Sequence, residues 1–159
     1  MRVNIALLTV TDTRTIDTDK SGSILVKKIK EQNHNLVDRK IVKDEKKEIK
    51  KILSNWLKYK ELDVIITTGG TGLTGRDITP EVIKEIADKE IPGFGELFRE
   101  LSYKTVGTSA MQSRACAVLA KGKYIFALPG SSGGVTDAWE GILKYQLDIN
   151  HKPCNFVEL

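Results

Sequence analysis

The stretch LDVIITTGGTG, residues 62–72, decides the fold, because an apolar run rich in β-branched residues passes directly into glycines. Such a run is typical of a strand buried on both faces of a parallel sheet. A strand that ends in glycines and leads to a helix exposes backbone N–H groups, which bind phosphate without a basic side chain. Residues 67–72 therefore predict an anion-binding loop at the carboxyl edge of the sheet.

Strand and helix patterns alternate on both sides of this stretch. We expect strands at residues 3–10, 36–42, 62–68, 114–120 and 123–128, and helices within residues 21–33, 44–60, 79–86, 94–101 and 135–142. The expected N-caps are Ser21, Asp44 and Thr79. Pro80 suits a first helical turn, and Lys58 and Lys60 are expected to complement the end of the second helix. The alternation predicts a single three-layer α/β/α domain over residues 1–159, with a mostly parallel central sheet.

Composition is that of an ordinary globular chain: of 159 residues, 40% are hydrophobic and 29% charged. It excludes wholesale disorder, and no apolar run approaches the roughly 20 residues that span a bilayer. The first ten residues suit a strand better than a signal peptide, so we expect a cytoplasmic protein without a membrane partner. Cys116 and Cys154 are expected to be reduced thiols, and two histidines make a zinc site improbable.

The net charge of +4 lies largely in residues 43–60. Acidic residues are interleaved with these lysines, and no aromatic ladder accompanies them. We interpret this segment as a solvated helix face and expect no nucleic-acid partner.

Four turns rich in Thr, Ser, Asp and Gly are expected at one edge, because the carboxyl ends of parallel strands meet there and ligands bind beyond them. The turns contain residues 11–13, 43–44, 69–72 and 129–134. The candidate binding residues are Thr11, Asp12, Thr68, Gly69, Gly70, Thr71, Gly72, Pro129, Gly130, Ser131 and Ser132. The glycine loop has neither the Gly-Lys-Ser/Thr ending of a P-loop nor a G-x-G-x-x-G pattern, which disfavours P-loop NTPases and dinucleotide oxidoreductases.

Three acids, Asp12, Asp44 and Asp77, are expected beside these loops. Carboxylates near a phosphate repel it unless a cation lies between them, and Mg²⁺ is the usual one. Read alone, Asp44 is equally a helix cap and Asp77 merely precedes one, while Arg76 either clamps a phosphate or pairs with Asp77. Without a Ser-His-Asp or Cys-His arrangement, the pattern favours nucleotidyl or phosphoryl transfer by positioning and electrostatics.

The run TTGGTGLTGRDITPE, residues 67–81, closely resembles the signature of the MoaB/MogA family of molybdenum cofactor biosynthesis proteins. PGFGELFRELSY at 92–103, SAMQSRA at 109–115 and LPGSSGGVTDAWEGIL at 128–143 are similar to that family in the same order. The resemblance implies a fold that binds molybdopterin. In the catalytic members of the family, the protein adenylylates the terminal phosphate of molybdopterin with Mg²⁺ and ATP and releases pyrophosphate. The resemblance maps the two functional aspartates, here also the expected Mg²⁺ ligands, onto Asp44 and Asp77. It also maps Asp12, Ser109 and Arg114 as binding residues, and Arg76, beside Asp77, is a further candidate.

Two features point to the MoaB branch of the family. Ser131 and Ser132 stand where adenylyltransferases of the MogA branch tend to have Asn-Pro, and KPCNF at 152–156 resembles MoaB. Some MoaB proteins lack the aspartate at position 77 and are thought to bind without adenylylating. Because Asp44 and Asp77 are both present, we expect a catalytic MoaB-type protein, the alternative being a non-catalytic molybdopterin carrier. The resemblance also implies a homotrimer or homohexamer and a downstream molybdate-insertion protein.

Overall fold

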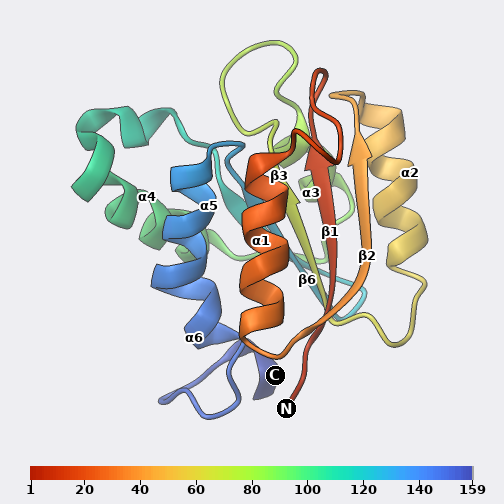
Figure 1. The fold of residues 1–159 in the computed structure, drawn as a ribbon, viewed down its shortest axis with the longest axis vertical. Coiled ribbons are helices and arrows are strands. Elements are labelled where there is room, and N and C mark those ends of the chain that lie inside the picture. The colour runs from red at the N-terminus through yellow and green to blue at the C-terminus, as the bar shows by residue number, and fades with distance from the viewer. Residues whose placement is uncertain (159) are drawn as a thin grey trace.

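The run at residues 62–68 forms the centre of a six-stranded sheet in the computed structural model, which describes residues 1–158. The sheet order is β2 (Asn35–Val42), β1 (Asn4–Val10), β3 (Val64–Thr68), β6 (Lys123–Leu128), β5 (Cys116–Ala120) and β4 (Lys89–Glu90). The first four strands are mutually parallel, and β5 and β4 continue the sheet in antiparallel pairing. Their parallel ends place the segments after β1, β2, β3 and β6 at one edge (Figure 1).

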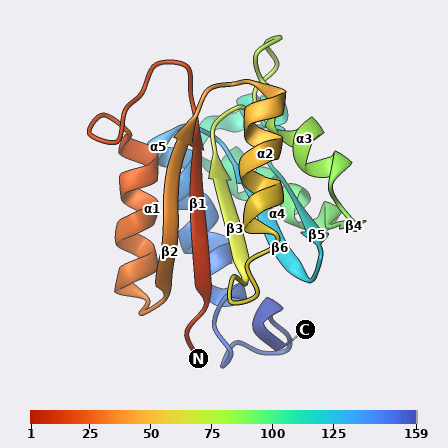
Figure 2. The same ribbon diagram turned by 90° about the vertical axis from the view of Figure 1, so that its right-hand side faces the viewer.

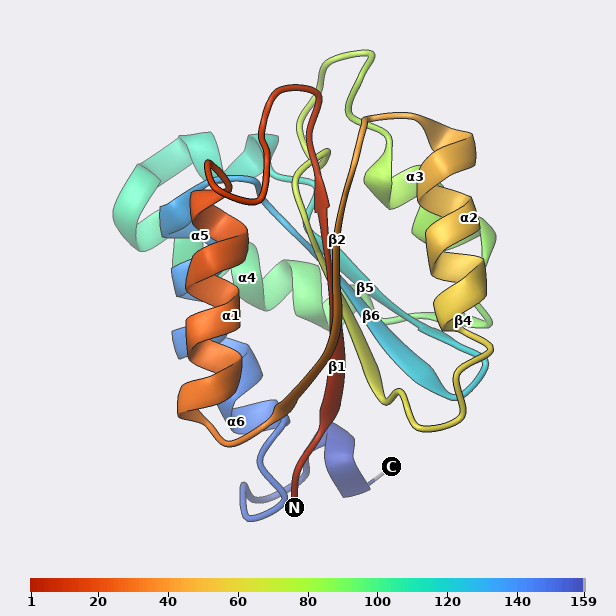
Figure 3. The ribbon, with the colours of Figure 1, turned by 45° about the vertical axis from the view of Figure 1, so that its right-hand side comes forward.

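Helices cover both faces of the sheet, as Figure 3 shows with the sheet nearly edge-on. One face carries α1 (Lys20–Glu31), α4 (Pro92–Val106) and the run of α5 (Ser132–Ala138), the π-helical turn η2 (Trp139–Leu143) and α6 (Lys144–Gln146). The other face carries α2 (Lys46–Trp56) and α3 (Thr79–Glu85), which lie in front of the sheet in Figure 2. Two short 3-10 helices, η1 (Gly107–Gln112) and η3 (Phe156–Glu158), follow α4 and end the described chain. The expected three-layer α/β/α architecture is confirmed.

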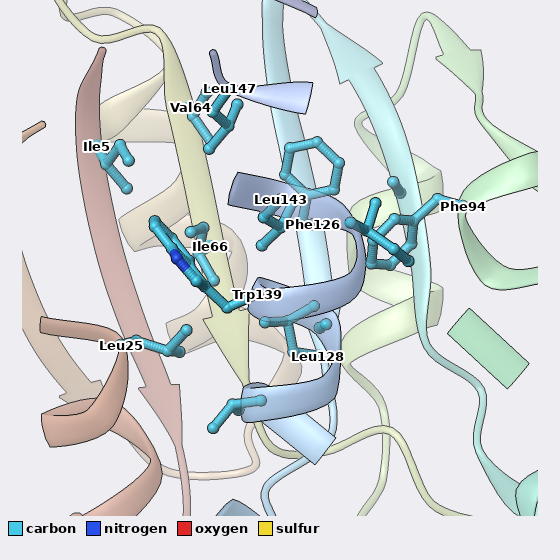
Figure 4. Packing of buried hydrophobic residues seen from close by; sticks show 14 of the residues in the cluster. Ile5, Leu25, Val64, Ile66, Phe94, Phe126, Leu128, Trp139, Leu143 and Leu147 are labelled. Carbon is cyan, nitrogen blue, oxygen red and sulfur yellow. The ribbon is translucent and has the colours of Figure 1, made fainter. Parts of the chain in front are cut away.

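Two hydrophobic cores result, one on each face of the sheet. Alternate residues of a strand point to opposite faces, so Ile5 and Leu7 contribute to one core while Ala6 and Leu8 contribute to the other. Figure 4 shows the first core, where Trp139 and Leu143 pack on the side chains of β3 and β6. Both faces are covered, so β3 is buried along its whole length, including Thr67 and Thr68 at the end that leads into the site.

The predicted helix caps were wrong in each case. Asp19, not Ser21, caps α1, and its carboxylate accepts the Gly22 N–H at 2.9 Å. Helix α2 starts one residue later than expected, so Glu45 and not Asp44 stands at its N-cap, and it ends at Trp56 before Lys58 and Lys60. Thr79 is already helical and directs its hydroxyl to the Gly69 carbonyl at 3.0 Å. Ser21 and Thr79 make hydrogen bonds to other groups instead, and no described side chain donates one to the Asp44 carboxylate.

Boundaries and two small elements also differ from expectation. Strands β3 and β5 each begin two residues later than predicted, the two-residue β4 was not predicted, and the last helix contains the π-helical turn. The segment after residue 150 has no helical or strand periodicity in its sequence, yet it includes η3. None of the helices within residues 1–158 is long and apolar enough to cross a membrane.

Candidate functional site

The carboxyl edge of the sheet holds a cavity of about 470 Å³. Its walls come from the ends of β1, β2, β3 and β6 and from the segment after η1. The structure brings together ten of the predicted site residues in this lining: Thr11, Asp44, Gly69, Gly70, Thr71, Gly72, Asp77, Pro129, Gly130 and Ser131. The two glycine-containing loops therefore face one space, as the parallel topology requires.

The glycine loop is fixed by contacts that leave little freedom at Gly69. Its φ of +99° is a conformation that residues with a side chain rarely adopt, and a Cβ there would lie 2.1 Å from the Val10 carbonyl oxygen. The Gly69 N–H donates to Leu128 O at 3.0 Å, and the Thr68 hydroxyl donates to Pro129 O at 2.7 Å. These bonds join the two loops into one floor for the cavity.

Asp44 and Asp77 both line the cavity and lie against the glycine loop. A Cβ on Gly70 would be 3.2 Å from Asp44 Oδ1, and one on Gly72 would be 2.8 Å from Asp77 Oδ2, so small residues make room for both carboxylates. Burial raises the pKa of Asp44, and the charges of Asp12 and Asp77 raise it further. No described side chain donates a hydrogen bond to the Asp44 carboxylate, which leaves its oxygens available to a ligand or a cation.

The carboxylate of Asp77 is anchored differently. Oδ2 accepts the Thr74 N–H at 2.9 Å and the Thr74 hydroxyl at 2.6 Å. Burial raises the pKa of Asp77, but these hydrogen bonds, a further one from the Gly72 N–H and the charge of Arg114 outweigh it, so the pKa lies below its ordinary value. Asp77 is thus ionised and held in one orientation.

The two-carboxylate arrangement fits Mg²⁺, which often takes one or two protein carboxylates and completes its shell with substrate phosphate oxygens and water. Within residues 1–158, no group of three or more His, Cys, Asp or Glu side chains comes together as a self-sufficient metal site. A cation held by Asp44 and Asp77 would therefore need ligand oxygens from a bound phosphate.

Arg76 pairs with Asp12 and not with Asp77, the partner that the sequence had offered. Its Nε and Nη2 donate to the two Asp12 oxygens at 3.1 and 2.9 Å, and the Glu45 carboxylate lies 3.6 Å away. Asp12 also accepts the Asp44 N–H at 3.1 Å. These hydrogen bonds, from Arg76 first and then from Asp44, lower the pKa of Asp12. The pair ties three loops together at the exposed rim, outside the cavity lining.

Arg114 faces the protein and not the cavity. Its guanidinium donates to Gly72 O at 2.7 Å and Asp77 O at 2.6 Å and pairs with the Glu81 carboxylate. Its backbone N–H donates to Thr71 O at 3.0 Å. The side chain therefore holds both ends of the loop that carries Asp77.

Ser109 is exposed on η1 and does not line the cavity, whereas Gln112 and Ser113 from the same SAMQSRA segment do. The sequence motif indicated this segment. Which of its residues face the cavity depends on the short helix η1, which has no periodic pattern in the sequence. Thr68 and Ser132 line a second, adjoining cavity of about 250 Å³ together with Arg14 and Lys20, which the sequence did not suggest.

Residues 6–148 match the family model described as "Probable molybdopterin binding domain". The chain belongs to the MoaB/MogA family. It is 44% identical over 152 residues to molybdenum cofactor biosynthesis protein B of Escherichia coli K12, covering 96% of this chain and 89% of that protein. It is 48% identical over 149 residues to the protein of the same name from Staphylococcus aureus MRSA252, covering 92% and 88%.

Solved structures of the family share the fold. A crystal structure of molybdenum cofactor biosynthesis protein B superposes with a TM-score of 0.89 at 42% identity, covering 92% of each chain. The tungsten cofactor synthesizing protein MoaB from Pyrococcus furiosus gives a TM-score of 0.80 at 37% identity, covering 89% of this chain and 91% of that one. The resemblance seen in the sequence motifs is confirmed.

Proposed function

We propose that this MoaB/MogA family member acts in molybdenum cofactor biosynthesis, where it binds molybdopterin and adenylylates its terminal phosphate with Mg²⁺ and ATP. The observation that supports the proposal is one cavity lined by Asp44, Asp77 and both glycine-containing loops. Backbone N–H groups suit phosphate oxygens, and paired acids beside phosphate suit a divalent cation. The family relatives named for molybdenum cofactor biosynthesis support the choice of pterin.

In this reaction the acceptor phosphate of molybdopterin attacks the α-phosphorus of ATP, and pyrophosphate leaves. The loops at Gly69–Gly72 and Pro129–Ser131 hold phosphate oxygens, which positions the two reactants. Bound Mg²⁺ would offset the negative charge that develops during transfer. Thr74 holds Asp77 in a fixed orientation and no described side chain donates to the Asp44 oxygens, so both acids would be able to hold the cation.

The test is the variant Asp77→Asn, which keeps an oxygen that accepts from Thr74 but removes the charge. We expect adenylyl-molybdopterin and pyrophosphate formation to fall by at least about a hundredfold while molybdopterin affinity changes little, because the charge acts in the transition state. Asp17→Asn, an exposed aspartate at the same edge, is the matched control and should retain wild-type turnover. Wild-type turnover in Asp77→Asn would refute the role of this acid.

A molybdopterin carrier without ATP chemistry is the second candidate, supported by Ser131 and Ser132 in place of the Asn-Pro pair of the MogA branch. Incubating purified protein with molybdopterin, ATP and Mg²⁺ separates the two. Pyrophosphate release supports the enzyme, and pterin binding without release supports the carrier. With either activity, we propose a cytoplasmic homotrimer or homohexamer that passes its ligand to a molybdate-insertion protein.

A further inference from the structure

A second cavity, of about 250 Å³, adjoins the acidic one at the same edge. The two share Val10, Thr11, Gly69, Gly130 and Ser131 in their linings, so the backbones of the glycine loops stand between them. The second cavity extends toward the start of α1, and its lining includes Ser21, Thr68 and Ser132.

Two cations, Arg14 and Lys20, line this second cavity. Neither forms an ion pair with any residue in the described part of the chain, unlike Arg76 and Arg114 at the same edge. Both are exposed, so a ligand in the cavity can recruit them. Their charges are therefore available to an anion.

The one acid in this lining, Asp19, has its charge compensated by an ion pair with Arg39. It is 2% exposed, and its carboxylate accepts the Thr9 hydroxyl at 2.6 Å, the Gly22 N–H at 2.9 Å and Arg39 Nη2 at 3.1 Å. The ion pair with Arg39 cancels its charge. The cavity thus has a net positive lining, whereas the adjoining cavity contains Asp44 and Asp77 and no cationic side chain.

We propose that the cavity at Arg14 and Lys20 is an anion subsite that takes a phosphoryl group of a substrate, while the acidic cavity takes the cation-bound part. A guanidinium and an ammonium group that have no partner carboxylate are the groups that phosphate recognition uses. The opposite charges of two touching cavities then give a bound phosphate ester one orientation. The assignment of the phosphoryl group to a substrate rests on the proposed function, but the subsite itself does not.

The test uses inorganic pyrophosphate as the probe, titrated calorimetrically into the purified protein in EDTA so that no divalent cation takes part. We expect the double variant Arg14→Ala/Lys20→Ala to bind pyrophosphate at least about tenfold more weakly, since each charge-assisted contact contributes on that order. Its affinity should also depend less steeply on salt. Lys58→Ala/Lys60→Ala, which removes the same charge at the opposite edge of the sheet, should bind within about twofold of wild type.

The same variants titrated with ATP and with molybdopterin identify the source of the phosphoryl group, because only the ligand that uses the subsite loses affinity. Equal pyrophosphate affinity in Arg14→Ala/Lys20→Ala and wild type would overturn the proposal, as would no measurable binding to wild type. Asp77→Asn should keep pyrophosphate binding in EDTA while losing turnover. Failure of the adenylylation proposal is therefore distinguishable from failure of the subsite.

Discussion

Gly69 is the residue on which the geometry of the cavity floor depends most directly. Its φ of +99° and the 2.1 Å separation between a would-be Cβ and Val10 O leave no place for a side chain. We expect Gly69→Ala to lower the free energy of unfolding by about 3 kcal/mol, from combined backbone strain and overlap with a strand. Urea denaturation followed by circular dichroism measures the loss.

The control for Gly69 is Gly93→Ala. Gly93 lies in α4 at a position where an added Cβ meets no atom within 4 Å, and alanine favours a helix. We expect the free energy of unfolding of Gly93→Ala to equal that of the wild type or exceed it by up to about 1 kcal/mol. An equal loss in both variants would show that strain at Gly69 is not the cause.

His34 gives the protein a pH-dependent stability. Its Nδ1 accepts the Val3 N–H at 3.2 Å, and burial, with a smaller contribution from the amino terminus, lowers its pKa despite the opposing charge of Asp148. Below about pH 6.5 the unfolded chain takes up a proton that the folded chain resists, so the free energy of unfolding falls as pH falls. We expect this fall between pH 8 and pH 5.5 to be smaller in His34→Asn, whose oxygen can still accept from Val3. Identical pH profiles from denaturant titrations would contradict the assignment.

At the scale of elements, hydrophobic periodicity predicted every long helix but not its cap. Apolar spacing reports burial, which the cores on both faces enforce. A cap depends on which nearby side chain meets an orphan N–H, and Asp19 competes successfully with Ser21 because it also pairs with Arg39. Asp44 does not cap α2 and lines the cavity instead. The sequence alone had left both positions possible for this residue.

Arg114 links three elements: the glycine loop, α3 and the start of β5. We expect Arg114→Ala to release the loop between Gly72 and Asp77, because the three partners Gly72 O, Asp77 O and Glu81 lose their donor. Amide hydrogen exchange at residues 72–77 should then accelerate by about tenfold or more, since exchange reports local opening. Arg114→Lys should restore part of the protection, since its ammonium reaches one carbonyl but not both.

The matched variant for this element is Arg99→Ala. Arg99 also donates to carbonyls, those of Ser113 and Ala115, but it makes no contact with residues 72–77. Exchange in that loop should be unchanged. Protection at 72–77 that survives in Arg114→Ala would mean that Asp77 and Thr74 hold the loop without the arginine.

At the scale of the whole molecule, the alternation of elements predicted the layers and the edge where the site lies, but not the strand order. The order β2-β1-β3-β6-β5-β4 depends on which edge each crossover returns to, and β4 is two residues long, below any periodic signal. Arg76 was expected at this edge because it follows the glycine loop, whereas Arg114 was named by the family resemblance alone. Their partners, Asp12 and the Gly72 and Asp77 carbonyls, come from segments far along the chain, so side-chain type alone did not define their roles.

The tail after residue 150 also packs against the core, although its sequence has no helical or strand periodicity. The C-terminal end of the described chain lies at the edge of the sheet opposite the site (Figure 1). In this tail, the centroid of the Phe156 ring lies 4.6 Å from that of Tyr124 and 5.6 Å from that of Phe126. Asn155, 1% exposed, accepts the Val157 and Glu158 N–H groups and donates to Ile149 and His151 carbonyls. The tail is therefore held both by aromatic packing and by satisfied buried polar groups.

Phe156→Ala tests whether the tail stabilises the whole fold rather than lying passively on it. We expect a loss of about 2–3 kcal/mol in the free energy of unfolding, somewhat less than for a fully buried aromatic, because Phe156 is only half-buried. Met111→Ala, at a side chain 79% exposed, should change stability by less than about 0.5 kcal/mol. Because the tail and the cavities lie at opposite edges, Phe156→Ala should bind pyrophosphate with wild-type affinity at temperatures where it is folded. Unchanged stability would show that the tail contributes no net energy, and lost binding in the folded variant would show that the two edges are coupled.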